Sequence, residues 1–278
     1  MALPHRHVPA GTTPMAAVAP DDPTPIMSVE GLVKNYGSVE ILAGIDFTVG
    51  KGEFVCIVGP SGSGKTTLLR SIAGLQPPTS GRTVFEGVEV TEPPAKLAVV
   101  FQDYSRSLLP WLTVSDNVLL PIKGRFPKEE LRDRVERALT SVGLAGKGML
   151  YPWQMSGGMQ QRAAIARGLA YNPDVLLMDE PFAAVDAQTR VELEDLVLRL
   201  RDEYDTTVLF VTHDIDEAVY LADRVLVLSG APTSVAANIE THLPVPRNQI
   251  ETKRLERYNT LRAKVYELIQ QAKSHASI

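Results

Sequence analysis

Residues 54–67 read Phe54-Val55-Cys56-Ile57-Val58-Gly59-Pro60-Ser61-Gly62-Ser63-Gly64-Lys65-Thr66-Thr67. The apolar run at 54–58 predicts a buried strand, and residues 66–75 predict a helix that ends at a glycine and a proline pair. Between them, residues 59–66 fit the phosphate-binding pattern G-x-x-x-x-G-K-[ST]. The glycines let successive backbone N–H groups face one anion, and the helix start adds a positive dipole end. This strand–loop–helix unit predicts an α/β fold with a P-loop NTPase core.

The side chains of this loop have separate expected roles. Lys65 supplies a positive charge for the β- and γ-phosphates, and the Thr66 hydroxyl is expected to ligate Mg²⁺. The residues expected to contact the nucleotide are Gly59, Pro60, Ser61, Gly62, Ser63, Gly64, Lys65, Thr66 and Thr67. The loop alone leaves the class of NTPase open, because GTPases, kinases and motors share it.

A pair of carboxylates follows a second apolar run, in Val175-Leu176-Leu177-Met178-Asp179-Glu180-Pro181. Strand alternation is expected to point Asp179 and Glu180 to opposite sides. Asp179 can hold Mg²⁺, and Glu180 can polarise the water that attacks the γ-phosphate. General-base help of this kind contributes about 10²–10⁴-fold to a rate. The pair therefore predicts hydrolysis, with Glu180 and Lys65 as catalytic candidates.

Composition excludes several classes of protein. The chain of 278 residues has a formal net charge of -5, without the overall basic character of a nucleic-acid binder. Cys56 is the single cysteine and cannot form an internal disulfide, so a reducing compartment is expected, with Cys56 as a small core residue. No apolar run approaches the roughly 20 residues of a membrane span, and the N-terminus lacks a convincing signal. We expect a cytoplasmic protein whose membrane role comes through a partner.

The chain divides into three expected parts. Residues 1–25, rich in Pro, Ala and Thr, predict a disordered tail. Residues 26–245 form the expected ATPase domain, with a helical insertion at about 103–168, while apolar runs such as 175–178 and 208–211 predict parallel strands. Residues 246–278 predict a helical extension with Leu255, Tyr258, Leu261, Val265 and Leu268 on one face. That helix either caps its own domain or serves docking or regulation, and both alternatives remain open.

Residues 155–162 read Met155-Ser156-Gly157-Gly158-Met159-Gln160-Gln161-Arg162 and predict a second anion site. Ser156 is a natural N-cap, and two glycines open the following helix. This stretch resembles the L-S-G-G-Q signature of the ABC ATPase family, with Met155 in place of Leu and Met159 in place of Gln. The resemblance implies a head-to-tail homodimer in which Ser156, Gly157 and Gly158 reach the ATP held by a second copy.

Further motifs of the family follow in order over roughly residues 27–230. The resemblance implies that Tyr36 stacks on adenine and that Gln102 links the Mg²⁺ and water site to the helical insertion. It also implies that Asp186 lies in a loop crossing the dimer interface and that His213 contacts the γ-phosphate. The implied fold is a RecA-like core with a mostly parallel sheet, an N-terminal antiparallel β-subdomain and an inserted α-helical subdomain. ATP and Mg²⁺ are the implied cofactors.

Two segments resemble the nitrate, sulfonate and taurine importer branch: residues 108–114, Leu-Leu-Pro-Trp-Leu-Thr-Val, and the tail around 244–247 and 261–262. The spacing at 104–107 departs from that pattern. The branch implies import of a small anion, membrane permease subunits, an extracytoplasmic solute-binding protein and a place at the cytoplasmic face of the membrane. Residues 103–115 are then expected to line a groove for a permease helix, with Trp111 and Leu112 either in that groove or in the core.

Three other functions remain open at this point. One is a soluble ABC ATPase acting in repair or cofactor assembly. Another is a nucleotide-dependent binding switch with negligible turnover, although Glu180 argues against it. The third is a P-loop small-molecule kinase, which would not need Ser156.

Overall fold

The computed structural model describes residues 24–102 and 107–275. The predicted N-terminal tail, apart from its last two residues, therefore lies outside the described residues. So do the start of the predicted helical insertion and most of the unusual spacing at 104–107.

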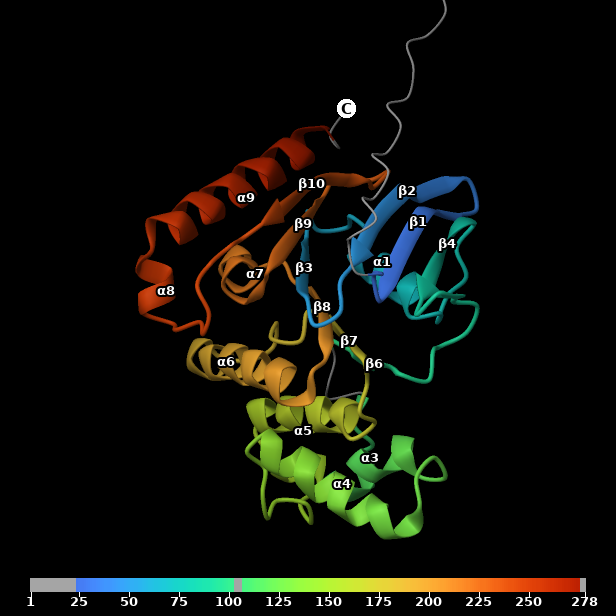
Figure 1. Ribbon diagram of the computed structural model, residues 1–278, viewed down its shortest axis with the longest axis vertical. Helices are drawn as coiled ribbons and strands as arrows, with labels where there is room; N and C mark the ends of the chain where they lie inside the picture. Colours follow the sequence, from blue (N-terminus) through green and yellow to red (C-terminus); the bar gives the residue numbers. More distant parts are fainter. Residues whose placement is uncertain (1–23, 103–106, 276–278) are drawn as a thin grey trace, which may run out of the picture.

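A six-stranded sheet forms the centre of the molecule (Figure 1). Its order is β10 (Val235–Glu240), β9 (Arg224–Leu228), β3 (Phe54–Val58), β8 (Thr207–Val211), β7 (Val175–Asp179) and β6 (Leu97–Val100). Neighbouring strands from β9 to β6 run parallel, and β10 pairs antiparallel with β9. The continuous apolar runs of these strands fit a sheet that is covered on both faces.

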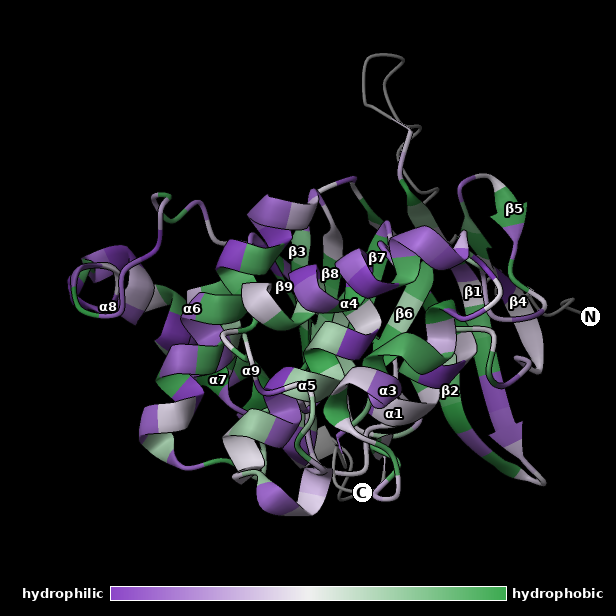
Figure 2. Ribbon diagram, turned by 90° about the horizontal axis from the view of Figure 1, so that it is seen from below, coloured by the Kyte–Doolittle hydropathy of each residue, from purple (hydrophilic) through white to green (hydrophobic). Residues whose placement is uncertain are grey.

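Each face of the central sheet packs into its own core. On β3, Phe54 and Cys56 point into one core and Val55 and Ile57 into the other. The first core contains residues of α5 (Gly157–Leu169), α6 (Ala187–Tyr204) and α7 (Ile215–Leu221), and the second contains those of α1 (Lys65–Ile72). Figure 2 shows mostly hydrophobic strands at the centre and a mostly hydrophilic outer helix α8 (Glu251–Arg254). The predicted α/β P-loop fold is confirmed.

A four-stranded antiparallel sheet lies against the second core. Its order is β2 (Val39–Val49), β1 (Met27–Tyr36), β4 (Ser80–Phe85) and β5 (Val88–Glu89). The buried residue Thr233 ties this sheet to the phosphate-binding loop. Its backbone exchanges hydrogen bonds of 2.8 Å with Ile41 and Ala43, and its hydroxyl donates to the Ser63 carbonyl at 2.7 Å. Strand β2 is therefore held directly beside that loop.

The insertion between β6 and β7 is helical, as expected. It contains α3 (Val114–Leu119), α4 (Lys128–Ser141) and α5, with short 3-10 helices at Leu120–Ile122 and Pro152–Gln154. Figure 1 shows α3 and α4 at one end of the molecule, with α5 between them and the core. Trp111 is 70% exposed and therefore belongs to the surface rather than to the core.

The C-terminal extension packs on the chain's own domain. Helix α9 (Glu256–His275) contacts α7, β9 and β10. Its buried residues are Tyr258, Leu261, Val265, Ile269 and Ala272. Over residues 24–102 and 107–275, no helix combines the length and apolar character that crossing a membrane requires.

Candidate functional site

Four loops that carry predicted site residues leave the same edge of the central sheet. The order β3-β8-β7-β6 places the carboxyl ends of these parallel strands in a row. The Thr212 N–H donates to the Ile57 carbonyl at 3.1 Å, and the Glu180 N–H donates to the Val211 carbonyl at 2.8 Å. Ligands of open α/β sheets bind at such carboxyl ends. The fold therefore brings together residues that the sequence separates by more than 100 positions.

The phosphate-binding loop requires glycine at two positions. Gly62 and Gly64 have φ values of 79° and 75°, a region that other residues rarely adopt. A Cβ on Gly64 would also lie 2.7 Å from Cγ2 of Ile41. Helix α1 begins directly afterwards, and no side chain caps its N-terminus. Its free N–H groups are thus available to an anion.

Lys65 lies folded back along this loop. The side chain is 7% exposed, and Nζ donates to the carbonyl oxygens of Gly59 at 3.1 Å and Pro60 at 3.0 Å. Burial lowers the pKa of Lys65, while Glu180 and Asp179 act in the opposite direction. A phosphate group would offer the ammonium a charged acceptor in place of two neutral ones.

Thr66 and Asp179 form a pair of oxygen donors suited to a hard cation. The Thr66 hydroxyl donates to Oδ1 of Asp179 at 3.3 Å, and Asp179 is 3% exposed. Desolvation raises the pKa of Asp179 because burial disfavours the charged carboxylate. A bound cation would offset that effect and stabilise the charged form. Among the described residues, no group of three or more His, Cys, Asp or Glu could hold a metal by itself. The pair fits Mg²⁺, which commonly takes its remaining ligands from phosphates and water.

Glu180 occupies the turn after β7 with two polar neighbours. Its Oε2 lies 3.2 Å from Nε2 of Gln102 and 3.0 Å from Nδ1 of His213. Strand alternation did not foresee this arrangement, because β7 ends at Asp179 and Glu180 adopts a φ of 44°. A left-handed backbone at one residue re-aims the side chain, and such conformations concentrate at functional sites. Glu180 is therefore oriented by the turn rather than by the pleat of the strand.

A hollow of about 580 Å³ opens between these groups. Its lining comprises Tyr36, Ile41, Ser61, Gly62, Gly64, Lys65, Thr66, Thr67, Glu180 and His213. Tyr36 is 51% exposed, and its hydroxyl accepts a hydrogen bond from Gln76. Ile41 is the one lining residue that the sequence did not predict. This volume is within the range of small-molecule sites.

The second predicted group of site residues does not line this hollow. Ser156, Gly157, Gly158 and Asp186 lie at the starts of α5 and α6, and Ser156 is exposed. Ser156 Oγ accepts from the Met159 N–H at 3.3 Å, and Asp186 Oδ1 accepts from the Thr189 N–H at 3.0 Å. Within the described part of the chain, the phosphate-binding loop and the 156–158 stretch therefore belong to separate surfaces.

Charged residues that the sequence did not single out, of which Glu217 is buried, support the His213 loop. Arg190 of α6 contacts Oδ2 of Asp214 at 3.2 Å and Oε1 of Glu217 at 3.4 Å. Thr212 donates to Oε2 of Glu217 at 2.6 Å, and desolvation raises the pKa of Glu217 to about 7. The spacing Asp214-x-x-Glu217 before an apolar run resembles a helix N-terminus signal and could have indicated α7.

Comparison with known proteins agrees with this geometry. Residues 42–183 match the family model described as ABC transporter. An ABC transporter ATP-binding protein of Methanocaldococcus jannaschii is 47% identical over 83% of this chain and 87% of its own. An aliphatic sulfonates import ATP-binding protein of Bacillus cereus is 43% identical over 84% and 89%. A bicarbonate transport ATP-binding protein of Synechococcus elongatus is 42% identical over 89% of this chain, which spans 38% of that longer relative.

Solved structures give the same result. A dimeric ATP-binding cassette in a post-hydrolysis state, bound to ADP and phosphate, superposes with a TM-score of 0.67 at 33% identity. The match covers 77% of this chain and 98% of the cassette. A second dimeric cassette has a TM-score of 0.68 at the same identity and coverage.

Proposed function

This chain belongs to the ABC transporter family of ATP-hydrolysing subunits, and on that premise we propose that two copies close on two ATP molecules to power solute import through a membrane permease. The observation that carries the proposal is the placement of Glu180. Its carboxylate lies at the hollow that the phosphate-binding loop lines, in contact with both Gln102 and His213.

The polar residues in and beside this hollow have separate proposed roles. Lys65 and the loop amides bind the β- and γ-phosphates, and Tyr36 stacks on the adenine. Thr66 and Asp179, with Gln102, would hold a Mg²⁺ ion, which neutralises phosphate charge. Glu180 orients the attacking water and accepts its proton. His213 contacts the γ-phosphate and keeps the Glu180 carboxylate in place.

The 156–158 stretch is proposed to complete the site of the other copy. Its serine and glycines start a helix at an exposed surface outside the hollow, and that helix end can bind an anion. The dimeric form of the solved cassettes supports this arrangement. Asp186, at the start of the neighbouring helix, lies in the loop proposed to cross between the copies.

The transported solute is proposed to be a small anion such as a sulfonate, nitrate or taurine. The names of the relatives support this class, because they describe import of aliphatic sulfonates and transport of bicarbonate.

Residues 26–245 are the proposed ATPase domain, acting at the cytoplasmic face of the membrane with permease subunits and an extracytoplasmic solute-binding protein. Nothing in those names favours repair, cofactor assembly, a kinase or a binding switch.

Replacing the proposed base tests this function. We expect Glu180→Gln to bind ATP as the parent does, to accumulate as an ATP-bound dimer and to lose about 10²–10⁴-fold in turnover. Steady-state phosphate release and size-exclusion chromatography with ATP measure both effects. Glu89→Gln, on the exposed strand β5, is the matched control and should hydrolyse at the parent rate. Hydrolysis by Glu180→Gln at the parent rate would contradict the assignment.

A further inference from the structure

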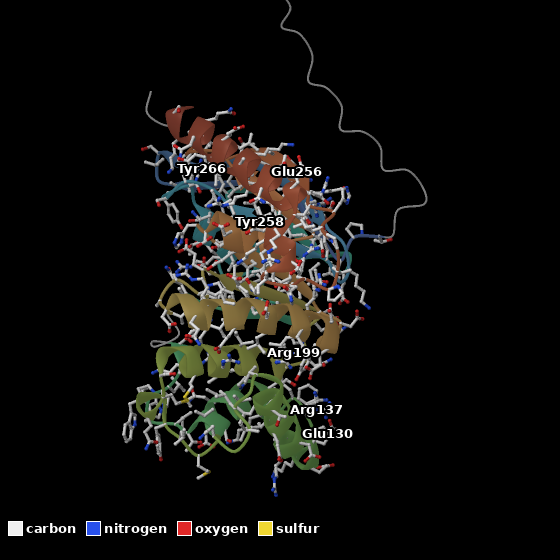
Figure 3. All side chains as sticks on the ribbon, turned by 90° about the vertical axis from the view of Figure 1, so that its left-hand side faces the viewer. Glu130, Arg137, Arg199, Glu256, Tyr258 and Tyr266 are labelled. Atoms are coloured by element: carbon white, nitrogen blue, oxygen red, sulfur yellow. The ribbon has the colours of Figure 1, made fainter. Side chains whose placement is uncertain are left out.

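Helix α9 holds the first turn of α7 through two side chains. The Tyr258 hydroxyl donates to Oδ1 of Asp216 at 3.0 Å, and Nε of Arg262 contacts the same oxygen at 2.8 Å. Tyr258 is 2% exposed, and burial together with the charge of Asp216 raises its pKa. Figure 3 looks onto α9 and labels Glu256, Tyr258 and Tyr266 of this helix. The Asp216 carboxylate is thus fixed by the C-terminal extension.

The turn that Asp216 belongs to also carries His213. Asp214 caps α7, and its Oδ1 accepts from the N–H groups of Asp216 at 2.8 Å and Glu217 at 3.2 Å. The Asp214 N–H in turn donates to the Thr212 hydroxyl at 3.0 Å. His213 lies between Thr212 and Asp214 and has no rigid element of its own. Its position therefore depends on the first turn of α7 as well as on the end of β8.

A hollow of about 640 Å³ lies between this turn and the exposed side of α9. His213 and Asp216 line it from one side, and Asn259, Arg262 and Tyr266 line it from the other. Ile215 of this turn packs against the hydrophobic core, whereas the side of the turn that faces the hollow has fewer packed neighbours. The polar contacts of Tyr258 and Arg262 supply support that packing does not.

We propose that Tyr258 and Arg262 are positioning residues for ATP hydrolysis, which hold His213 against Glu180 by fixing Asp216. The inference rests on the proposed function, in which Glu180 activates the water and His213 contacts the γ-phosphate. It assigns the C-terminal extension a role in turnover rather than in stability alone. Misplacement of a catalytic group slows the chemical step without weakening the contacts that bind substrate elsewhere.

Removal of one hydroxyl tests this role. In the purified full chain, we expect Tyr258→Phe to lower kcat about three- to tenfold, with KM for ATP within about twofold of the parent. Tyr204→Phe is the control, because its hydroxyl donates to Ser141 at 3.1 Å, where the end of α6 meets the end of α4. Each variant loses one hydroxyl that donates to a neighbouring side chain, but Tyr204→Phe should keep the parent kcat.

A second pair of variants tests the ion pair between Arg262 and Asp216. Arg262→Ala should lower kcat as Tyr258→Phe does, whereas Arg254→Ala, which breaks the exposed pair with Glu251, should not. Because the effect passes through His213, Tyr258→Phe should cause no further loss in a His213→Ala background. A purely structural role would not distinguish the two backgrounds.

The outcomes separate this inference from the proposed function. If the parent hydrolyses ATP and Tyr258→Phe turns over at the parent rate, the role of Tyr258 is overturned while the proposed function stands. That role is also overturned if Tyr258→Phe slows His213→Ala by the same factor as the parent. A parent chain without ATPase activity would overturn the proposed function and this inference together.

Discussion

Glu217 lies beneath the turn that carries His213, and its environment opposes its charge. The side chain is 4% exposed, with Thr212 and Arg190 as its polar partners and with Asp214 and Glu194 as like charges nearby. Desolvation is the largest cause that raises its pKa from 4.5 to about 7. A carboxyl that favours its neutral form in the folded state makes stability depend on pH.

The sign of this dependence follows from proton binding. Between pH 4.5 and about 7 the folded chain keeps a proton on Glu217 that the unfolded chain has lost, so the free energy of unfolding falls as pH rises. Between about pH 5.5 and 7.5, we expect the free energy of unfolding of the parent to fall by about 2 kcal/mol more than that of Glu217→Gln. Urea unfolding at several pH values measures this, with the more exposed Glu203→Gln as control. Equal slopes for the parent and Glu217→Gln would contradict the prediction.

At the scale of the elements, long apolar or periodic segments were predictable and short amphipathic ones were not. The buried strands β3, β7 and β8 have continuous apolar runs, and α4 and α6 have clear helical periodicity. By contrast, β4 begins with three exposed residues, β10 has one buried residue among six, and α7 has only seven residues, so these three elements give weak periodic signals. Helix α7, whose first turn supports the His213 loop, is one of these missed elements.

The candidate site divides along the same line. The phosphate-binding loop could be predicted because its chemistry lies within 59–67 and depends on local backbone geometry. The contact of Gln102 and His213 with Glu180 depends on the strand order, which is not local, and on a left-handed φ at Glu180, which the apolar run before it does not indicate. Helix α1 was expected to reach residue 75 but ends at Ile72, because Gly74 takes a φ of 68° and passes close to Glu92.

The starts of α5 and α6 are packed so closely that one methyl group is excluded. A Cβ on Gly158 would lie 2.5 Å from Cγ2 of Thr189. Gly158→Ala keeps the backbone N–H but should push the two helix ends apart, at a cost of about 1–3 kcal/mol. We expect lower ATPase activity and a lower melting temperature.

A second substitution tests whether the Thr189 methyl group causes the effect of Gly158→Ala. Thr189→Ser removes the clashing methyl and keeps the hydroxyl that donates to Asp186, so Gly158→Ala/Thr189→Ser should regain most of the lost activity. Gly168→Ala on the same helix is the control, because its nearest neighbour, Leu176, lies at 3.4 Å. Failure of Thr189→Ser to rescue would show that Gly158 is needed for another reason.

At the scale of the whole molecule, the phosphate-binding loop and the 156–158 stretch lie on separate surfaces of one copy. A single copy therefore does not bring them to the same nucleotide. The proposed head-to-tail pairing through a two-fold axis brings the phosphate-binding loop of each copy to the 156–158 stretch of the other. It therefore places position 61 near position 156 of the second copy, but leaves two copies of the same position apart.

Cross-linking of two single-cysteine variants tests this pairing. Ser61→Cys and Ser156→Cys are made separately in the Glu180→Gln chain, since residues 61 and 156 are both exposed. Cys56 can stay, because it is fully buried and burial raises the pKa of its thiol. With ATP and a short bismaleimide, we expect the mixture to give a covalent dimer on denaturing gels, and each variant alone to give little. A dimer that forms as well from one variant alone, or without ATP, would exclude head-to-tail closure on the nucleotide.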